Sequence, residues 1–389
     1  MHFTNKSQAN RCINASLLDS MGRSRGVALI TAMLITALVA IAAAAMAERQ
    51  QLDIRRTENL IHGDQAMIYA FTAESIVSDL LLLNDSKNSN TLEELELANT
   101  ALAVVAASIP IEGGGIAFKI SDMSGSFPLN RLVDKDKIKD DKYYQALKLL
   151  LADLEWHDEE NNKIVTVSTD QASYILDWID QNTEQDSPGA EDSTYLSRPL
   201  PYRTANQPLV SLTELRLMAE MTNDEYNLLA NPMDGSAPKV NVLPGDAFKI
   251  NVNTASREVL MNLYDGLNEE QAEEMANKIM EARESDNASA TNPTTESGIT
   301  NTQKVADIIT EVLRSANASG TSGTSGTPGT QRRPTYESAK ILDIDIISTY
   351  FQLTTTVGVG RSQIQLISLL KRDATNKTVQ TIRRGIGIL

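Results

Sequence analysis

The stretch VALITAMLITALVAIAAAAMA, from Val27 to Ala47, decides how this 389-residue chain is organised. None of its residues is charged, and at about 1.5 Å of rise per residue a helix of this length spans about 31 Å, enough to cross the hydrocarbon core of a bilayer. It begins just after Arg23 and Arg25 and runs into the charged, amphipathic stretch ERQQLDIRRTEN, from Glu48 to Asn59. We therefore predict a transmembrane helix that continues as helix beyond the membrane.

The flanks of this segment distinguish it from an ordinary secretory signal peptide. A signal peptide has a shorter apolar core, and its small-residue cleavage site follows that core. Here the natural cleavage position precedes the apolar core, at Gly26, which resembles the leader of type IV prepilins. The resemblance implies that a prepilin peptidase cleaves after Gly26 and that the new N-terminal residue, Val27, is N-methylated. Met21 is an alternative start and leaves the short leader MGRSRG.

Removal of the leader changes the cysteine count and the charge. The only cysteine, Cys12, lies in residues 1–26, so the mature chain has no disulfide. The leader carries a net charge of +3, which leaves −19 on the mature chain against −16 on the whole chain. The positive-inside rule then predicts a single-pass protein of a Gram-negative inner membrane, with a cytoplasmic N-terminus and its bulk in the periplasm. A chain this acidic argues against a nucleic-acid ligand and favours a divalent cation or a basic partner protein.

Beyond the anchor, hydrophobic periodicity predicts an α+β architecture. Helix is predicted from Glu48 to about Leu83, where the polar residues 84–90 end it, and a strand is predicted over 116–120. Further helices are predicted over 139–154, 170–179, 212–220, 224–230, 256–263, 269–283 and 305–313, and further strands over 250–252, 350–357 and 363–370. This order indicates an α+β module that is interrupted by a helical insertion. Two low-complexity tracts, 285–297 and 315–330, are predicted to be mobile loops because neither can bury much apolar surface.

Several motifs together resemble one family. They are RGVALITAM (25–33), QQLDIRRTEN (50–59), GDQA (63–66), DMSGSFPLNRLV (122–133), DWID (177–180), GAEDSTY (189–195) and INVNTA (250–255). Their order and types resemble the general secretion pathway protein K family, the large minor pseudopilin of the type II secretion system. The resemblance covers nearly the whole mature chain.

The resemblance implies a pilin-like α+β fold with a long N-terminal transmembrane and amphipathic helix, a small antiparallel sheet and a large helical insertion of SAM-like or helix-hairpin-helix-like character. The domains would be a leader (1–26), a transmembrane helix (27–47), the first part of the pilin-like domain (48–130), the helical insertion with its acidic loop and disordered linkers (131–335), and the closing strands (336–389).

The resemblance also implies a function. The chain would sit at the pseudopilus tip and initiate pseudopilus assembly for the export of folded proteins across the outer membrane. Its partners would be the I and J minor pseudopilins, the pseudopilus shaft, the inner-membrane secretion platform and the prepilin peptidase.

The fifth mature residue, Thr31, adds to this interpretation. Most pseudopilins have glutamate here, and a carboxylate inside a bilayer is costly unless it is paired. In pilin-like assemblies that carboxylate is thought to pair with the N-terminal ammonium of the preceding subunit, and a first subunit has none. A threonine can instead bond a carbonyl one turn back. Thr31 could equally be a residue that is merely tolerated in a membrane helix, but together with the resemblance it favours a tip subunit.

An acidic loop after the DWID helix is the best ligand candidate. Asp180, Asn182, Glu184 and Glu191 occupy the first, third, fifth and twelfth positions of a calcium loop, and Asp192 adds a carboxylate. Gln185 replaces the glycine of an EF-hand, so a calcium loop of another shape is expected. Calcium fits better than zinc because the mature chain has no cysteine and only two distant histidines, His62 and His157. An ordinary solvated acidic loop is the alternative; the resemblance favours calcium, because protein K homologues bind it.

Other functions have weaker support. Residues 251–272 resemble a helix-hairpin-helix DNA-binding element, but Asn268 replaces its second glycine, and the acids that follow would repel phosphate. A DNA-uptake receptor is therefore the remote alternative, and a minor pilin that initiates a type IV pilus is the nearer one. No catalytic constellation is evident, since the Ser-Asp-Met-Ser-Gly turn at 121–125 has no histidine placed as its base. We expect a protein that is not an enzyme and that does not bind nucleic acid.

Overall fold

A computed structural model describes residues 9–83, 91–111, 113–134, 139–158, 163–232, 236–244, 248–288, 298–319, 336–373 and 376–387. The chain divides into two compact units, Met1–Gln65 and Ala66–Leu389. The polar stretch 84–90 and most of the two low-complexity tracts lie outside the described residues.

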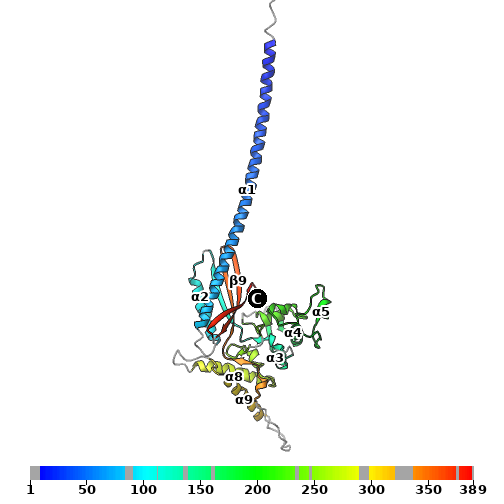
Figure 1. Ribbon diagram of the computed structural model, residues 1–389, viewed down its shortest axis with the longest axis vertical. Coiled ribbons are helices and arrows are strands. Elements are labelled where there is room, and N and C mark those ends of the chain that lie inside the picture. The colour runs from blue at the N-terminus through cyan, green and yellow to red at the C-terminus, as the bar shows by residue number, and fades with distance from the viewer. Residues whose placement is uncertain are drawn as a thin grey trace, which may run out of the picture. The chain divides into compact units, whose positions relative to one another are not determined.

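Helix α1, Ala9–Leu83, is the longest element of the chain and is drawn in blue in Figure 1. It continues without a break through Ala47, as predicted from the sequence. Alanine is the commonest residue of the apolar part, and no proline interrupts the helix, so the local propensity favours it. Within the described ranges, one helix segment, Val27–Leu82, is long and apolar enough to cross a membrane by length and composition.

A four-stranded antiparallel sheet, in the order β1-β8-β9-β10, combines one early strand with the last three. The strands are β1 (Gly115–Asp122), β8 (Tyr350–Val359), β9 (Ser362–Asp373) and β10 (Thr378–Ile386). The strands predicted over 116–120, 350–357 and 363–370 are confirmed. Strand β10 was not predicted from the sequence. This topology confirms an α+β module whose sheet is interrupted in sequence.

One face of the sheet is covered by the end of α1. Ala66, Ala70, Ala73 and Val77 recur at helical spacing and are buried, and the small alanines let the helix backbone approach the strands closely. They pack against apolar side chains of the strands, namely Phe118, Ile120, Phe351, Leu353, Val357, Val359, Leu366 and Leu370.

A single carboxylate, that of Glu74, interrupts this apolar contact. It accepts hydrogen bonds from Ser368 Oγ at 2.7 Å and Thr381 Oγ1 at 2.5 Å. The Arg384 guanidinium bonds both of its oxygens, through Nε at 2.9 Å and Nη2 at 2.7 Å. Burial alone raises the pKa of Glu74, but these donors bring the net pKa below its usual value. The carboxylate therefore ties α1 to β9 and β10 as an ion.

Helix α2, Leu92–Ser108, contacts β1 and was not predicted. Thr91 caps its N-terminus by accepting from the Glu94 amide. Its Asn99 side chain donates to the Ile120 carbonyl at 2.9 Å and accepts from the Ile120 amide at 2.7 Å. These two bonds satisfy outward-facing backbone groups of β1, as a neighbouring strand would.

The chain between β1 and β8 forms the helix-rich part with a hydrophobic core of its own. Its helices are α3 (Asp141–Asp153), α4 (Gln171–Ile179), α5 (Asp192–Leu196), α6 (Asn223–Ala230), α7 (Arg257–Met261), α8 (Glu269–Ala288) and α9 (Thr302–Ser319), with 3₁₀ turns η2 (Leu129–Leu132), η3 (Leu212–Leu217) and η5 (Ser338–Lys340). Short strands pair as β2 (Phe127–Pro128) with β5 (Val240–Asn241), β3 (Glu155–Asp158) with β4 (Lys163–Thr166), and β6 (Ile250–Asn251) with β7 (Ile344–Asp345).

Most predicted helices are confirmed here, with two corrections. The segment predicted as a helix over 212–220 is the 3₁₀ turn η3, closed by a capping box between Ser211 and Glu214. The low-complexity tracts were predicted to be loops throughout, but α8 extends to Ala288 and α9 to Ser319.

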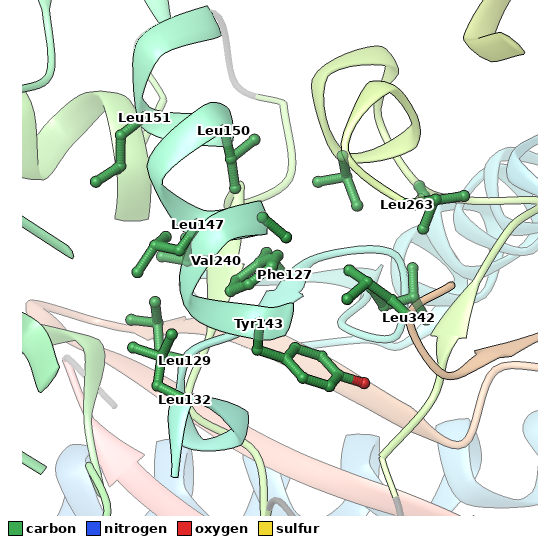
Figure 2. Close-up of a cluster of buried hydrophobic side chains, with 14 of the residues drawn as sticks. Phe127, Leu129, Leu132, Tyr143, Leu147, Leu150, Leu151, Val240, Leu263 and Leu342 are labelled. Atoms are coloured by element: carbon green, nitrogen blue, oxygen red, sulfur yellow. The ribbon is translucent and has the colours of Figure 1, made fainter. Parts of the chain in front are cut away.

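The core of the helix-rich part forms around α3. Tyr143, Leu147, Leu150 and Leu151 lie on one face of that helix and are buried, and Phe127 meets the Tyr143 ring edge-on at 6.1 Å between centroids (Figure 2). The Tyr143 hydroxyl leaves this core to meet the chain just before β7.

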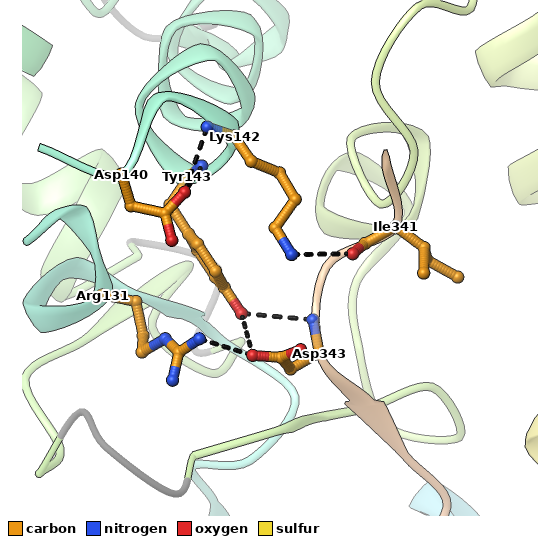
Figure 3. Close-up of polar contacts among 6 residues, drawn as sticks. All are labelled: Arg131, Asp140, Lys142, Tyr143, Ile341 and Asp343. Carbon is orange, nitrogen blue, oxygen red and sulfur yellow. Dashed lines mark hydrogen bonds and ion pairs between the residues drawn. The ribbon is translucent and has the colours of Figure 1, made fainter. Parts of the chain in front are cut away.

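That hydroxyl donates to Asp343 Oδ2 at 3.2 Å and accepts from the Asp343 amide at 3.1 Å (Figure 3). Arg131 Nη2 reaches the same carboxylate oxygen at 2.5 Å, and Lys142 Nζ donates to the Ile341 carbonyl at 2.9 Å. These contacts join the start of the helix-rich part to its end.

Candidate calcium site and anchor residues

The anchor residues predicted from the sequence lie on α1. Gly26 and Val27 fall inside the helix, and the Val27 side chain is exposed. Thr31 Oγ1 donates to the Ala28 carbonyl at 3.0 Å, so its hydroxyl is satisfied within its own helix. This is the bond that the sequence predicted for a threonine at this position.

Helix α4 carries Asp177, and Asp180 follows its last residue as the C-cap. Ile175, Leu176 and Trp178 bury one side of α4 in the core, and the helix ends where the Asp180 amide donates to the Leu176 carbonyl at 2.9 Å. Asp177 and Asp180 are thereby held at a helix C-terminus. The partial negative charge at that end disfavours carboxylates, so two buried acids there call for compensation.

The loop folds around Asp177, which is fully buried. Its carboxylate accepts from the Ala190 amide at 2.8 Å and from the Asp186 amide at 3.3 Å. Gly189 lies directly against it, because a Cβ at this position would be 2.2 Å from Asp177 Oδ2. Burial is the main cause that raises the pKa of Asp177 to about 7, and the Asp186 and Glu191 charges add to it.

Asp180, at the end of α4, and Glu191, at the end of the loop, lie near each other, since the charge of Glu191 acts on Asp180. Asp180 is 6% exposed and Glu191 is 3% exposed, so water does not compensate their charge. Burial first, and then the Glu191 and Asp186 charges, raise the pKa of Asp180 to about 6; burial also raises the pKa of Glu191. One oxygen of each carboxylate is engaged, Asp180 Oδ2 by Asn182 Nδ2 at 2.7 Å and Glu191 Oε2 by Thr204 Oγ1 at 3.2 Å.

The other oxygens of this pair, Asp180 Oδ1 and Glu191 Oε1, are buried and have no hydrogen-bond partner among the described residues. Asn206 Oδ1 is in the same condition. The Asn206 amide nitrogen donates to the Asn182 carbonyl at 3.2 Å, which brings Asn206 to the same loop, and its backbone is left-handed at φ 45°. Orphaned buried oxygens are rare and require an explanation such as an ion.

The remaining predicted ligands are placed differently. Asn182 and Glu184 are exposed, and Asn182 Oδ1 accepts from the Glu184 amide at 2.6 Å. Asp192 is bound by Arg203 Nη1 at 2.6 Å and by the Thr204 amide at 3.1 Å. Over the described part of the chain, no three His, Cys, Asp or Glu side chains gather into a metal-binding group. A metal here therefore needs amide or backbone oxygens besides the two carboxylates.

Asn206 was not identified from the sequence. It lies beyond the twelve-residue spacing, in the stretch TANQP, where an asparagine has no feature that separates it from a turn residue. The donor set is all oxygen, flexible and partly anionic, which suits calcium and lacks the nitrogen or sulfur ligands of a zinc site.

The sequence is similar to proteins of one family, protein K of the type II secretion system. A family model for protein K of the type II secretion system matches residues 125–233. Type II secretion system protein K of Pseudomonas aeruginosa PAO1 is 37% identical over 244 residues, which cover 62% of this chain and 68% of that protein. The protein of the same name from Aeromonas hydrophila is 32% identical and is covered over 73% of its length, against 64% of this chain.

A solved structure supports the fold. The crystal structure of the GspK-GspI-GspJ complex from the type 2 secretion system of enterotoxigenic Escherichia coli contains a chain that matches with a TM-score of 0.57. That chain is 21% identical, and the match covers 86% of this chain and all of that one, which establishes a shared fold. With the identities and coverage of the relatives above, the chain belongs to the type II secretion system protein K family.

Proposed function

We propose that this protein is a minor pseudopilin that is anchored in the inner membrane by α1 and caps the periplasmic pseudopilus. Membership of the protein K family carries the proposal, because the relatives are named as components of this secretion system. The apolar residues Val27–Ala47 give the anchor, and the packing of the end of α1 on the sheet gives a pilin-like head. The N-terminus lies in the cytoplasm, and the head lies in the periplasm.

The position at the tip rests on Thr31. Its hydroxyl is satisfied by the Ala28 carbonyl, so this anchor needs no ammonium group from a preceding subunit. A subunit with this anchor can begin a fibre, and the protein initiates pseudopilus assembly. Its neighbours there are the I and J minor pseudopilins, in line with the related structure of a GspK-GspI-GspJ complex. The shaft and the inner-membrane platform complete its partners.

Processing of the N-terminus tests this function. The mature protein should begin at an N-methylated Val27, and Gly26→Val should accumulate as precursor because the prepilin peptidase needs a small residue before the scissile bond. Gly22→Val, in the same leader, is the matched control and should be processed normally. N-terminal sequencing and mass spectrometry give the result. A mature protein that starts after Ala47 would mean an ordinary signal peptide and would contradict the proposal.

Assembly gives the second test. The full-length protein, purified in mild detergent from cells that also express the I and J components, should bring both with it. If its native neighbours are instead the subunits of a type IV pilus, the same experiment identifies the chain as a minor pilin. Catalysis forms no part of the proposed function, which is structural.

We also propose that the acidic loop binds calcium through Asp180, Glu191 and Asn206, with Asn182, Glu184 and Asp192 at its rim. The three unpartnered buried oxygens support the proposal, since a cation bound in this loop would offset the charge of the two carboxylates and supply the partner that such oxygens lack. Calcium would also tie the loop to the end of α4.

Thermal unfolding of the full-length protein tests the calcium site. A ligand at twenty times its Kd stabilises the folded state by about 1.8 kcal/mol, which for a chain of this size raises Tm by about 2 °C. The paired change Asp180→Ala with Glu191→Ala should remove most of this rise, and Glu269→Ala, an exposed acid on α8, should leave it intact. Magnesium should substitute poorly because it requires a smaller octahedral shell. Equal Tm in chelator and millimolar calcium would leave the loop as a solvated acidic surface.

DNA binding has less support from the hairpin of α7 and α8. Arg257, a cation that could meet phosphate there, bonds Glu273 at 2.5 Å, and Asn268 caps α8 by accepting from the Gln271 amide at 2.9 Å. These contacts favour a scaffold. A filter-binding assay with duplex DNA separates the two functions.

A further inference from the structure

The two edges of the four-stranded sheet are finished differently. At one edge, α2 lies against β1 and its Asn99 amide bonds both backbone groups of Ile120, which are thereby engaged. At the other edge lies β10, and among the described strands its only partner is β9. An uncovered edge strand carries outward-facing amides and carbonyls that can pair with another extended chain. The fold thus protects one edge and leaves the other open.

An apolar cavity of about 680 Å³ adjoins the open edge. It lies on the sheet face opposite α1: Leu369 and Arg383 are directly paired across β9 and β10 and both line it, whereas their neighbours Ser368 and Arg384 point to Glu74 on the α1 face. The helix-rich part supplies the other wall. Val210 and Ile382 line this cavity and are 56% and 46% exposed, so its walls present apolar surface to solvent.

One cation faces this apolar space. Arg383 Nε is buried and has no hydrogen-bond partner among the described residues. Glu214, whose charge acts on Arg383, bonds other groups: its Oε1 accepts from the Val210 and Ser211 amides and its Oε2 from Trp178 Nε1. Asp134 also lines the cavity. Burial lowers the pKa of Arg383, and the Glu214 charge opposes this only in part. A desolvated guanidinium N–H beside apolar walls is complementary to a carboxylate.

We propose that β10 and this cavity form a docking groove for an extended segment of a partner protein, which adds as a fifth strand and places an acidic side chain on Arg383 between apolar ones. Main-chain pairing with β10 provides general affinity, and the cavity and Arg383 select the sequence, as in other cases of strand addition. The cavity adjoins the acidic loop, because Ile179, Gln181 and Pro208 line it, but none of the proposed calcium ligands does. It lies at the opposite edge of the sheet from Asn99.

A synthetic peptide tests the groove on the full-length protein in non-ionic detergent. The probe is dye-labelled Val-Thr-Glu-Thr-Val-Thr with blocked ends, which places the glutamate between two valines on one face of the strand, and its binding is followed by fluorescence anisotropy. The same peptide with glutamine for glutamate should bind about tenfold more weakly, the usual effect of a charge-assisted hydrogen bond. N-methylation of alternate residues should abolish binding because it removes the strand-pairing amides.

Variants of Arg383 then test whether this residue causes the preference for the glutamate peptide over the glutamine peptide. Arg383→Gln should bind both peptides equally, and Arg383→Lys should keep part of the preference. Arg361→Gln removes the same charge from the exposed β8–β9 turn and should behave as wild type. Resistance of each variant to limited proteolysis shows that it is folded. No binding by the wild type, equal binding of the two peptides, or a preference that survives Arg383→Gln would each overturn the proposal.

Discussion

The contact between Glu74 and Arg384 allows a prediction whose magnitude depends on pH. Glu74 is 6% exposed and sits on the alanine-lined face of α1, whereas the Arg384 side chain is 50% exposed. Arg384→Met therefore leaves the buried Glu74 carboxylate without its cation. Glu74→Gln leaves Arg384 without its anion, but this arginine is half exposed and can be hydrated. Breaking a buried pair costs about 3–5 kcal/mol. We expect about 3 kcal/mol for Arg384→Met at pH 7, because half of the arginine is already hydrated, and about 1–2 kcal/mol for Glu74→Gln.

The pH dependence of stability shows whether the deficit of Arg384→Met comes from the ionised Glu74 carboxylate. In the wild type the pKa of Glu74 is lowered, so its contribution to stability is present above the unfolded-state pKa of about 4.5 and is lost as the pH falls through the folded-state pKa. Without Arg384 only the Ser368 and Thr381 donors oppose burial, which is the largest cause, so we expect that pKa to rise and stability to be lost as the pH rises through it. The deficit of Arg384→Met relative to the wild type should therefore shrink by about half between pH 7 and pH 5.

Urea unfolding of the full-length protein in detergent, followed by pulse proteolysis, measures these differences. The double variant with Glu74→Gln should be more stable at pH 7 than Arg384→Met alone, since it removes the stranded charge. Arg361→Met, an exposed arginine on the same sheet, is the control and should change stability by less than about 0.5 kcal/mol. Equal deficits for Arg384→Met at pH 5 and pH 7, or simple additivity in the double variant, would refute this account.

Four further predictions concern the anchor and the loop. Thr31→Glu should insert into the membrane without any gain in pseudopilus initiation, measured by counting pili in overexpressing cells; a clear gain would indicate a shaft subunit. Gly189→Ala should lower Tm and weaken calcium binding in calorimetry, because its Cβ would lie 2.2 Å from Asp177 Oδ2, and wild-type values would argue against that packing. Calcium affinity should fall about tenfold per pH unit below the Asp180 pKa of about 6, since protons compete for the ligand. In chelator the raised pKa of Asp180 instead makes the protein less stable at pH 7.5 than at pH 5, and a flat profile would contradict this.

The sequence predicted those parts of the fold whose apolar residues follow one clear period. The α1 pattern and the strands over 350–357 and 363–370 are of this kind. Helix α2 was missed because its buried residues include only Leu102 and Ala106, so its apolar stripe is weak and its exposed Leu97 and Val104 blur it. Strand β10 was missed because only alternate residues are half-buried and two arginines stand in it.

The candidate site was predicted less completely than the fold. Carboxylate spacing identified Asp180 and Glu191, which the loop brings together. Spacing could not identify Asn206, which reaches the loop through a turn of the chain twenty-four positions after Asn182. It also could not show that Asp192 is engaged by Arg203, since a salt bridge depends on the path of the chain between the partners. Local patterns define helices and strands, whereas convergence of side chains depends on tertiary structure.

The interrupted sheet has a consequence for the order of folding. Asp122, at the end of β1, bonds Ser348 just before β8, and these residues are 226 positions apart in the chain. Closing so long a loop is slow, and strands of such separation pair late. The helix-rich part has its own core and can fold while the last strands are still being synthesised. Until then the alanine-lined face of α1 has no sheet to cover it, so a newly inserted subunit cannot present a finished head to the fibre before its C-terminal strands have arrived.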